Sequence, residues 1–495
     1  MTKPNSKIDA NRQLLTDAQS KGAGPTLRVF LKLSGPGWLQ SAITLGGGSL
    51  ASALFLGVLG GTNLLWPQLV AISTGVVMLS AISYVTLSTG ERPFHAINKH
   101  INPVLGWGWL LATCAANMIW CMPQFSLCYE ALQKNLAGSV VGDGMNSKLM
   151  VSAVLLAATG AVVVMNSRQG LAAKFFDWFL KALVGMIVIC FFGAVICLGF
   201  DGQLNFGAIL AGCVPDLRQW TQPTGDVAQL VFQLPADIQE FWSGRIVKQQ
   251  RSVMIAAAAT AVGINMTFLL PYSMLSRGWD RPFRGLARFD LATGMAIPYI
   301  LVTSCVVIAS AASFHAKIDS DFASNDPAVM QKSKAFGSAK NNLMARLELE
   351  LGATFTNMSE SEQLEQIAAL SLEEKKIASS LVRHNALQLS KSLVPFLGEK
   401  NAALVFGIGI FGMGFSTIVI LMLINGYVFC EMFGLKQGGP VHVIGCLVAG
   451  VSGAAWPLIW DDPDTKLWLA VLTSTFGMML LPIAYITFFM MMNSK

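Results

Sequence analysis

The sequence predicts an all-α integral membrane protein with ten membrane-spanning helices, arranged as two inverted repeats of five. Composition is the first reason: 53% of the 495 residues are hydrophobic and 13% are charged, whereas soluble domains carry roughly 25% charged residues. The second is that the apolar residues gather in runs of roughly 20, the length of a membrane helix. The third is an interruption of the first run by residues 46–49, Gly-Gly-Gly-Ser.

The apolar runs divide into two groups. They lie near residues 30–58, 63–89, 103–131, 148–166 and 175–200, and then near 250–276, 288–313, 401–432, 441–460 and 466–492. An odd number of spans in each group reverses the direction of the second group relative to the first. The arrangement is that of an inverted repeat, which is common among secondary transporters.

The polar segments complete the predicted organisation. Residues 1–29 form a tail that lacks the apolar core and cleavage site of a signal peptide. Residues 30–200 form the first repeat, 201–249 a loop, and 250–495 the second repeat, with an insertion over 314–400. The loop and the insertion are too polar to cross a bilayer.

Basic residues indicate the orientation of the chain. With the N-terminus in the cytoplasm, the inner connections carry Arg92, Lys99, Arg168, Lys174, Arg277, Arg281, Arg284, Arg288 and Lys436. The positive-inside rule then places both termini in the cytoplasm of a plasma or inner membrane, and the loop and insertion outside. The net charge of +6 is explained by this topology, so the lipid bilayer is an expected partner and nucleic acid is not.

The insertion contains a helix start. Ser371 and Glu374 have the spacing of a capping box and predict an amphipathic helix through Ile377, Leu381, Val382 and Leu389. The insertion would serve as a lid or spacer on the outer face, or as a partner-binding module.

The glycine interruption predicts a binding site. Gly46, Gly47, Gly48 and Ser49 should unwind the first helix. Unwound backbone at bilayer depth is tolerated only where it faces protein, water or a solute. Glycines there let the backbone approach a solute closely.

An inverted repeat predicts a second break in the span 250–276. Asn265, Met266 and Thr267 lie at mid-span, and Pro271 follows and should disturb the helix. Asn265 and Thr267 either form hydrogen bonds between helices or line a solute site opposite the first break.

Enzyme chemistry finds no support in the sequence. The five histidines are scattered without metal-ligand spacing, and the glycine run lacks the lysine of a phosphate-binding loop. No cofactor is expected. Cys114, Cys121 and Cys128 recur every seven residues, either as a soft-metal stripe or as small apolar side chains that pack in a core.

Three motifs resemble one family. Gly-Pro-Gly-Trp-Leu at 35–39, Leu-Leu-Trp at 64–66 and Thr-Gly-Glu-Arg at 89–92 are similar to the Nramp divalent-metal transporters, and the similarity extends over nearly all ten spans. The resemblance implies a LeuT-like fold in which helices one and six are broken and hold the substrate between them.

The chain departs from the family at the metal ligands. The resemblance places the family's Asp-Pro-Gly-Asn on residues 46–49 and its Met-Pro-His-Asn on residues 267–270, or one residue earlier with Met266 as the methionine. The acidic pair of the family's third helix falls on Cys121 and Gln124. The family's carboxylate and imidazole ligands are therefore absent, and no metal ligand set is assigned.

These observations predict a secondary active transporter of the Nramp type that works by alternating access. Its cargo would be a divalent cation that keeps most of its water, such as magnesium, because a dehydrated dication needs carboxylate ligands. A carboxylate brought from elsewhere, such as Asp290 or Glu240, would strengthen a metal site. The alternatives are a carrier of a small polar organic solute and a sensor that does not transport.

Overall fold

Helices form every regular element in the part of the chain that the computed structural model describes, which is residues 6–167, 171–200, 202, 204–382, 394–460 and 466–494. Within these residues, eight helices are long and apolar enough to cross a membrane. Two shorter apolar helices, Val184–Phe200 and Pro440–Ala454, accompany them. Together they match the ten predicted spans.

The first group of spans begins with a broken helix. Its elements are α3 (Pro36–Thr44), α4 (Gly47–Gly60), α5 (Trp66–Thr89), α7 (Pro103–Ala131), α8 (Met145–Ser167) and α9 (Leu171–Phe200). Local signals mark several of the ends. Proline stands in the first turn of α3, α5 and α7, the Asn102 side chain caps α7 by accepting from the Val104 amide, and Gly90 ends α5 in the left-handed conformation.

The second group also begins with a broken helix. Its elements are α12 (Ala236–Ala261), α13 (Ile264–Ser276), α14 (Arg284–Leu291), the π-helical turn η5 (Ala292–Ala296), α15 (Ile297–Phe314), α22 (Val394–Met432), α23 (Pro440–Ala454) and α25 (Lys466–Met492). Helix α22 has a kink at Gly398, whose φ of 73° lies outside the helical region.

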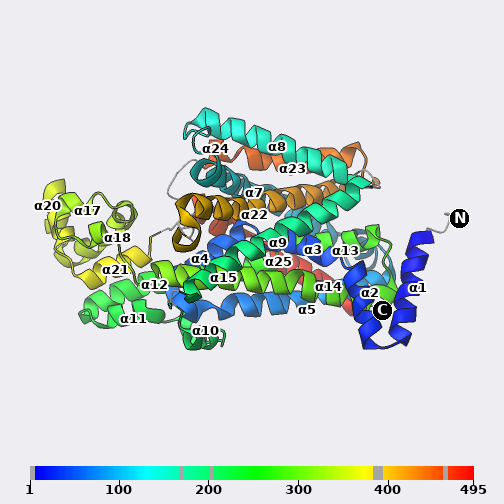
Figure 1. The fold of residues 1–495 in the computed structure, drawn as a ribbon, viewed down its shortest axis with the longest axis horizontal. Helices are drawn as coiled ribbons and strands as arrows, with labels where there is room; N and C mark the ends of the chain where they lie inside the picture. Colours follow the sequence, from blue (N-terminus) through cyan, green and yellow to red (C-terminus); the bar gives the residue numbers. More distant parts are fainter. Residues whose placement is uncertain are drawn as a thin grey trace.

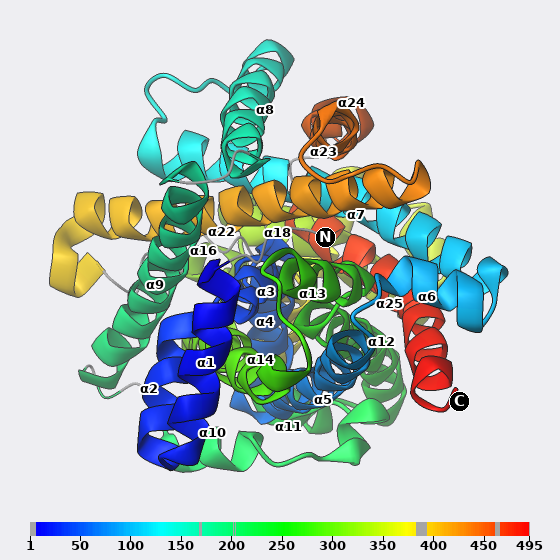
Figure 2. The same ribbon diagram turned by 90° about the vertical axis from the view of Figure 1, so that its right-hand side faces the viewer.

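The contacts of the two groups correspond pair by pair. Helix α15 packs on α4, and its counterpart α5 packs on α13, the equivalent half of the second broken helix. The middle helices α7 and α22 pack on each other. Helices α23 and α25 both pack on α7, and their counterparts α8 and α9 both pack on α22. The two groups therefore have equivalent packing, and the broken helices occupy the centre of the bundle in Figure 2.

Shorter helices connect the spans. They are η1 (Gly61–Leu64), α6 (Pro93–His100), η2 (Leu132–Leu136), α10 (Phe206–Gly212), η3 (Leu217–Trp220), α11 (Gly225–Phe232), η4 (Arg281–Phe283) and α24 (Trp456–Ile459). The predicted loop over 201–249 is thus largely helical, and α12 begins at Ala236 rather than near residue 250. Its polar outer turns are helical because the fully buried Trp242 packs there.

The two ends of the molecule carry separate helical additions (Figure 1). Helices α1 (Ser6–Ser20) and α2 (Ala23–Leu33) lie at one end. At the other end lie α16 (Ser320–Ala323), α17 (Pro327–Met330), α18 (Lys334–Leu351), α19 (Ala353–Thr356), α20 (Glu360–Ala368) and α21 (Leu372–Ser380). These six belong to the predicted insertion.

The predicted helix start at Ser371 is present, but the helix is shorter than predicted. The Ser371 side chain accepts from the Glu374 amide, and α21 ends at Ser380. Leu389 lies outside the described residues. The Glu374 carboxylate does not return to Ser371, because it accepts from Arg346 and Trp242 instead. A complete capping box occurs at Ser359 and Glu362, before α20.

Candidate functional site

The first helix break lies between Thr44 and Gly47. Leu45 and Gly46 leave the helical conformation, and Gly46 is extended with φ −96° and ψ −179°. The Ser49 hydroxyl donates to the Thr44 carbonyl across the break. A Cβ on Gly46 would lie 2.6 Å from Thr417 Oγ1, so the close approach of α22 requires glycine here.

The second break lies at Val262 and Gly263, between α12 and α13. The Asn265 side-chain oxygen accepts from the Met266 amide at 2.8 Å and satisfies a donor in the first turn of α13. Pro271 lies inside α13, which continues through it. The expected disturbance therefore occurs before the proline, where Gly263 approaches the ring of Trp120 too closely for a side chain.

The two breaks meet at a buried cavity of about 40 Å³. It is lined by Ile43, Gly46, Gly48, Ser49, Trp120, Gln124, Ala259, Thr260, Gly263, Asn265, Met266, Thr417, Leu421, Thr473 and Ser474. A cavity of this size holds a few water molecules, since one water needs about 10–15 Å³. Five of the seven predicted site residues thus lie together: Gly46, Gly48, Ser49, Asn265 and Met266.

Gly47 and Thr267 do not line the cavity, contrary to expectation. The Gly47 amide donates to Gln124 Oε1 at 2.8 Å, so the Gln124 side chain covers it. The Thr267 hydroxyl donates to the Ile264 carbonyl and accepts from Trp109 Nε1 at 3.0 Å. Thr267 therefore forms an interhelical hydrogen bond, which was the alternative left open for it.

Sequence reasoning missed the polar residues that other helices bring to the cavity. Gln124 comes from α7, Thr260 from α12, Thr417 from α22, and Thr473 and Ser474 from α25. Polar residues at mid-span were a usable signal, because they are costly in a membrane unless they have partners or line a path.

The cavity lining is electrically neutral. None of the side chains that line it is acidic, basic, histidine or cysteine. Within the described residues, no group of three His, Cys, Asp or Glu side chains could hold a metal ion. The side-chain acceptors there are the Met266 sulfur and the oxygen atoms of Ser49, Gln124, Thr260, Asn265, Thr417, Thr473 and Ser474. One lining donor, Asn265 Nδ2, is buried without a partner.

Asp290 and Glu240 do not reach this cavity. Asp290 caps α3 from outside, accepting from the Gly37 amide at 2.6 Å, the Gly35 amide at 3.2 Å and the Ser34 hydroxyl. It joins α14 to the start of the first broken helix. Glu240 lines a separate groove on the outer half of α12.

The cysteine stripe of α7 packs in the core. Cys121 and Cys128 are fully buried, and Cys128 Sγ lies 3.7 Å from the Phe411 carbonyl. Gly453 and Gly414 approach these two cysteines closely. The stripe therefore fills the interface between α7 and its neighbours, which was one of its two interpretations.

The family profile described as "Natural resistance-associated macrophage protein-like" matches residues 37–345 and 366–495. The chain belongs to the Nramp family. Members are transporters, so the protein is a multi-pass membrane transporter and not an enzyme. Family membership and the paired contacts of the two helix groups agree with the LeuT-like fold.

Solved structures similar to this Nramp protein come from Eremococcus coleocola. A manganese transporter in complex with an aromatic bis-isothiourea substituted compound is 14% identical with a TM-score of 0.49, over 95% of this chain and 97% of that chain. A mutant of that transporter has 14% identity and another has 13%, each with a TM-score of 0.48 and the same coverage. No curated protein sequence matches this chain.

Proposed function

We propose that this Nramp protein is a secondary transporter that carries a divalent metal cation by alternating access, and that the cation keeps most of its water. Magnesium fits this description best. The observation that supports the proposal is the neutral, oxygen-lined cavity between the two helix breaks. Magnesium loses its water reluctantly and is commonly held through retained water molecules.

The side chains present fit this cargo better than a transition metal. Iron, copper and zinc sites are selected by thiolate, thioether or imidazole ligands. The cavity lining offers one thioether, Met266, and neither of the other two. Hydroxyl and amide oxygens, together with carbonyls at the end of α3, can instead accept hydrogen bonds from the water bound to an ion.

The proposed site comprises Gly46, Gly48, Ser49, Asn265 and Met266, to which we add Gln124. For alternating access, the half-helices α3, α4, α12 and α13 and their neighbours α5 and α15 would rock against α7, α8, α22 and α23. Both termini are proposed to lie in the cytoplasm.

A small polar organic solute is the second candidate. The unpartnered Asn265 Nδ2 would suit a solute that offers an acceptor oxygen. Both cargoes need a wider cavity than the present 40 Å³. Organic ligands occupy pockets of roughly 300 Å³ or more, and a magnesium ion with five or six waters needs about 50–90 Å³ at about 10–15 Å³ per water.

Calorimetry on the purified full chain tests the proposal, with Mg²⁺, Mn²⁺ and Ca²⁺ titrated separately. We expect a Mg²⁺ response that Thr260→Val weakens about tenfold, one lost hydrogen bond to bound water being worth about 1.4 kcal/mol. Thr159→Val is the matched control, because both hydroxyls donate to a carbonyl of their own helix: Thr260 to Ala257 and Thr159 to Leu155. Thr159 lies on α8, away from the cavity.

Two results would contradict the metal proposal. The absence of a binding signal with all three ions would favour the organic solute, and a screen of polar metabolites would follow. An equal loss of Mg²⁺ binding in the Thr260 and Thr159 variants would remove the cavity as the site. Binding without uptake into proteoliposomes would instead indicate a sensor.

A further inference from the structure

Helix α2 (Ala23–Leu33) has an apolar face that no described part of the protein covers. Leu27 and Leu31 lie one helical turn apart and are 48% and 62% exposed. The other face packs inward: Val29 is buried, and the ring of Phe30 lies 5.3 Å from that of Phe289 on α14. The two leucines therefore form a ridge that points away from the protein.

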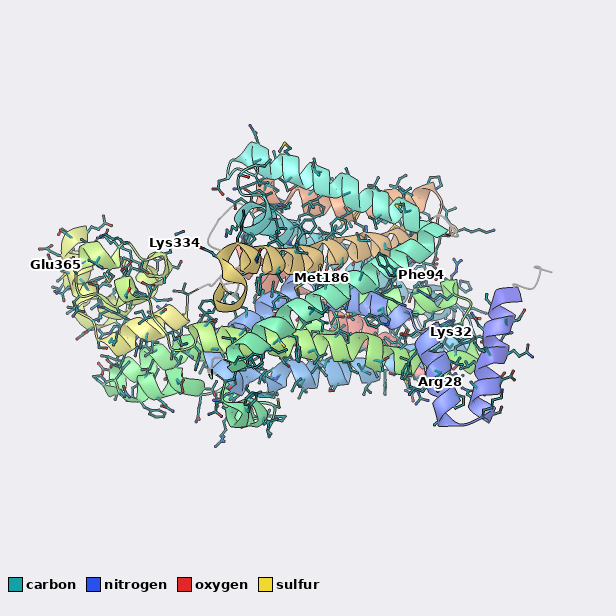
Figure 3. The ribbon with its side chains drawn as sticks, in the orientation of Figure 1. Arg28, Lys32, Phe94, Met186, Lys334 and Glu365 are labelled. Carbon is teal, nitrogen blue, oxygen red and sulfur yellow. The ribbon has the colours of Figure 1, made fainter. Side chains whose placement is uncertain are left out.

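A cationic stripe runs beside this ridge. Arg28 and Lys32 are exposed and also lie one turn apart, each directly after one of the leucines (Figure 3). Two further exposed cations lie close by. Lys181 on α9 donates to the Ser34 carbonyl at 3.5 Å. Arg288 on α14 directly precedes Phe289, whose ring packs on Phe30 of α2.

The helix is oriented as a surface helix. In Figure 1 it runs across the direction of the spans α5 and α15, at the end of the molecule where those spans end. A helix with leucines on one stripe and Lys or Arg beside it, lying across the spans, has the pattern of an interfacial membrane helix. Helix α1 covers it from another side.

We propose that α2 binds anionic phospholipid at the bilayer surface on the N-terminal side of the protein. Leu27 and Leu31 enter the acyl region, and Arg28 and Lys32 contact phosphate groups, with Lys181 and Arg288 adding to the positive field. Two residues, Ser34 and Gly35, separate α2 from the broken helix that reaches the cavity.

Through that connection, a lipid bound to α2 can affect the first broken helix. The Ser34 hydroxyl and the Gly35 amide both donate to Asp290, which holds the start of α3 against α14. A lipid-bound α2 fixes the position of this junction. The inference concerns the lipid alone and holds whatever the cargo is.

Thermal unfolding of the full chain in neutral detergent tests it, with added dioleoyl phosphatidylglycerol compared with dioleoyl phosphatidylcholine. We expect the anionic lipid to stabilise the protein more than the neutral lipid. Arg28→Gln/Lys32→Gln should reduce the apparent affinity for the anionic lipid roughly thirtyfold, since each cation near an anionic surface is worth about fivefold. The response to the neutral lipid should be unchanged.

Matched controls come from the opposite end of the molecule. Lys332→Gln/Lys334→Gln removes two exposed cations of the insertion, of which Lys334 is labelled in Figure 3, and should leave the lipid response intact. Leu27→Ser/Leu31→Ser should weaken binding of both lipids, whereas Leu349→Ser/Leu372→Ser, at leucines that are 63% and 44% exposed, should weaken neither. Single variants replace any double variant that fails gel filtration.

Any of the following results would overturn the inference. The first is an equal response of the wild-type protein to the two lipids. The second is an undiminished response of the Arg28/Lys32 variant to the anionic lipid. The third is stabilisation by glycerol phosphate alone, which would indicate a site for free anions, or stabilisation that rises with protein concentration, which would indicate a second copy on α2.

Discussion

Gly48 is a cavity-lining position at which even the smallest substitution would press on two other lining residues. A Cβ there would lie 2.9 Å from Ser474 Oγ and 2.9 Å from Thr260 Cγ2, both of which line the cavity. By contrast, a Cβ on Gly47 would meet Gln124 and Leu127. The two neighbouring glycines therefore face different surroundings: Gly48 faces the cavity, and Gly47 faces the side chains of α7.

We expect Gly48→Ala to reduce transport at least tenfold while the protein still folds, because the new methyl group occupies space between α4, α12 and α25. Uptake into proteoliposomes and thermal unfolding are the measurements. Gly160→Ala on α8 is the control, since its Cβ would meet only Leu447, at 3.7 Å. Wild-type uptake by the Gly48 variant would exclude this cavity from the transport path.

Short polar contacts hold both ends of the first broken helix to neighbouring elements. At one end Asp290 holds α3 to α14. At the other end His315, which follows α15, lies 2.9 Å from the Val58 carbonyl through Nδ1 and accepts from the Asp226 amide through Nε2, also at 2.9 Å. It thereby connects the C-terminal end of α4 to the start of α11. This geometry requires a neutral imidazole with its proton on Nδ1.

We therefore expect the contact that His315 makes with α4 and α11 to depend on pH. Burial lowers the pKa of His315 below its ordinary value of 6.5, against the opposing effects of the Val58 carbonyl and the Asp226 carboxylate. Because the folded-state pKa is the lower one, the contact is fully stable above about pH 6.5 and weakens as the pH falls below it. As the pH falls, hydrogen exchange of the α11 amides should therefore accelerate once it is corrected for the intrinsic effect of pH.

His315→Gln is the control for this effect, because glutamine has no proton to gain in this range. Its α11 amides should exchange at a rate that, corrected for the intrinsic effect of pH, does not change between pH 7 and pH 5. A wild-type protein whose α11 exchange, corrected for intrinsic pH effects, stays constant over that range would contradict the prediction.

At the scale of the whole molecule, the insertion is attached to one of the broken helices. Trp242 Nε1 on α12 donates to Glu374 on α21 at 3.2 Å, and Arg245 on α12 donates to Asn342 on α18 at 2.8 Å. Glu374 also pairs with Arg346 at 2.5 Å, and both side chains are 5% exposed. Since the far end of α12 lines the cavity, the insertion and the cavity share one continuous helix.

Breaking the buried ion pair should loosen the insertion. Glu374→Gln removes one of the two carboxylates that pair with the buried Arg346 guanidinium and leaves only the more exposed Glu350 as its charged partner. We expect this to cost about 1–3 kcal/mol. Faster hydrogen exchange in α18 and α21, with the spans unchanged, is the expected result. Glu373→Gln, at the preceding and less buried position, should have no such effect. Equal exchange in the two variants would mean that the pair does not hold the insertion.

Much of the fold could be predicted from the sequence because the bilayer imposes a length and a composition on each span. The spans at 103–131 and 63–89 correspond closely to α7 and α5. The start of α12 was missed, because its outer turns are polar and become helical only by packing Trp242 against the insertion. The end of α21 at Ser380 was missed for a similar reason: apolar spacing does not show where packing stops.

The sequence by itself determined the membrane class, the ten spans, both helix breaks and the family, because glycine, hydropathy and chain length act locally. Only the tertiary structure decided which polar groups share the cavity. Gln124 and Thr417 come from distant spans, and Thr267 turns toward Trp109 instead of the cavity. The rotation of each helix about its axis decides this, and packing against neighbours hundreds of residues away sets that rotation.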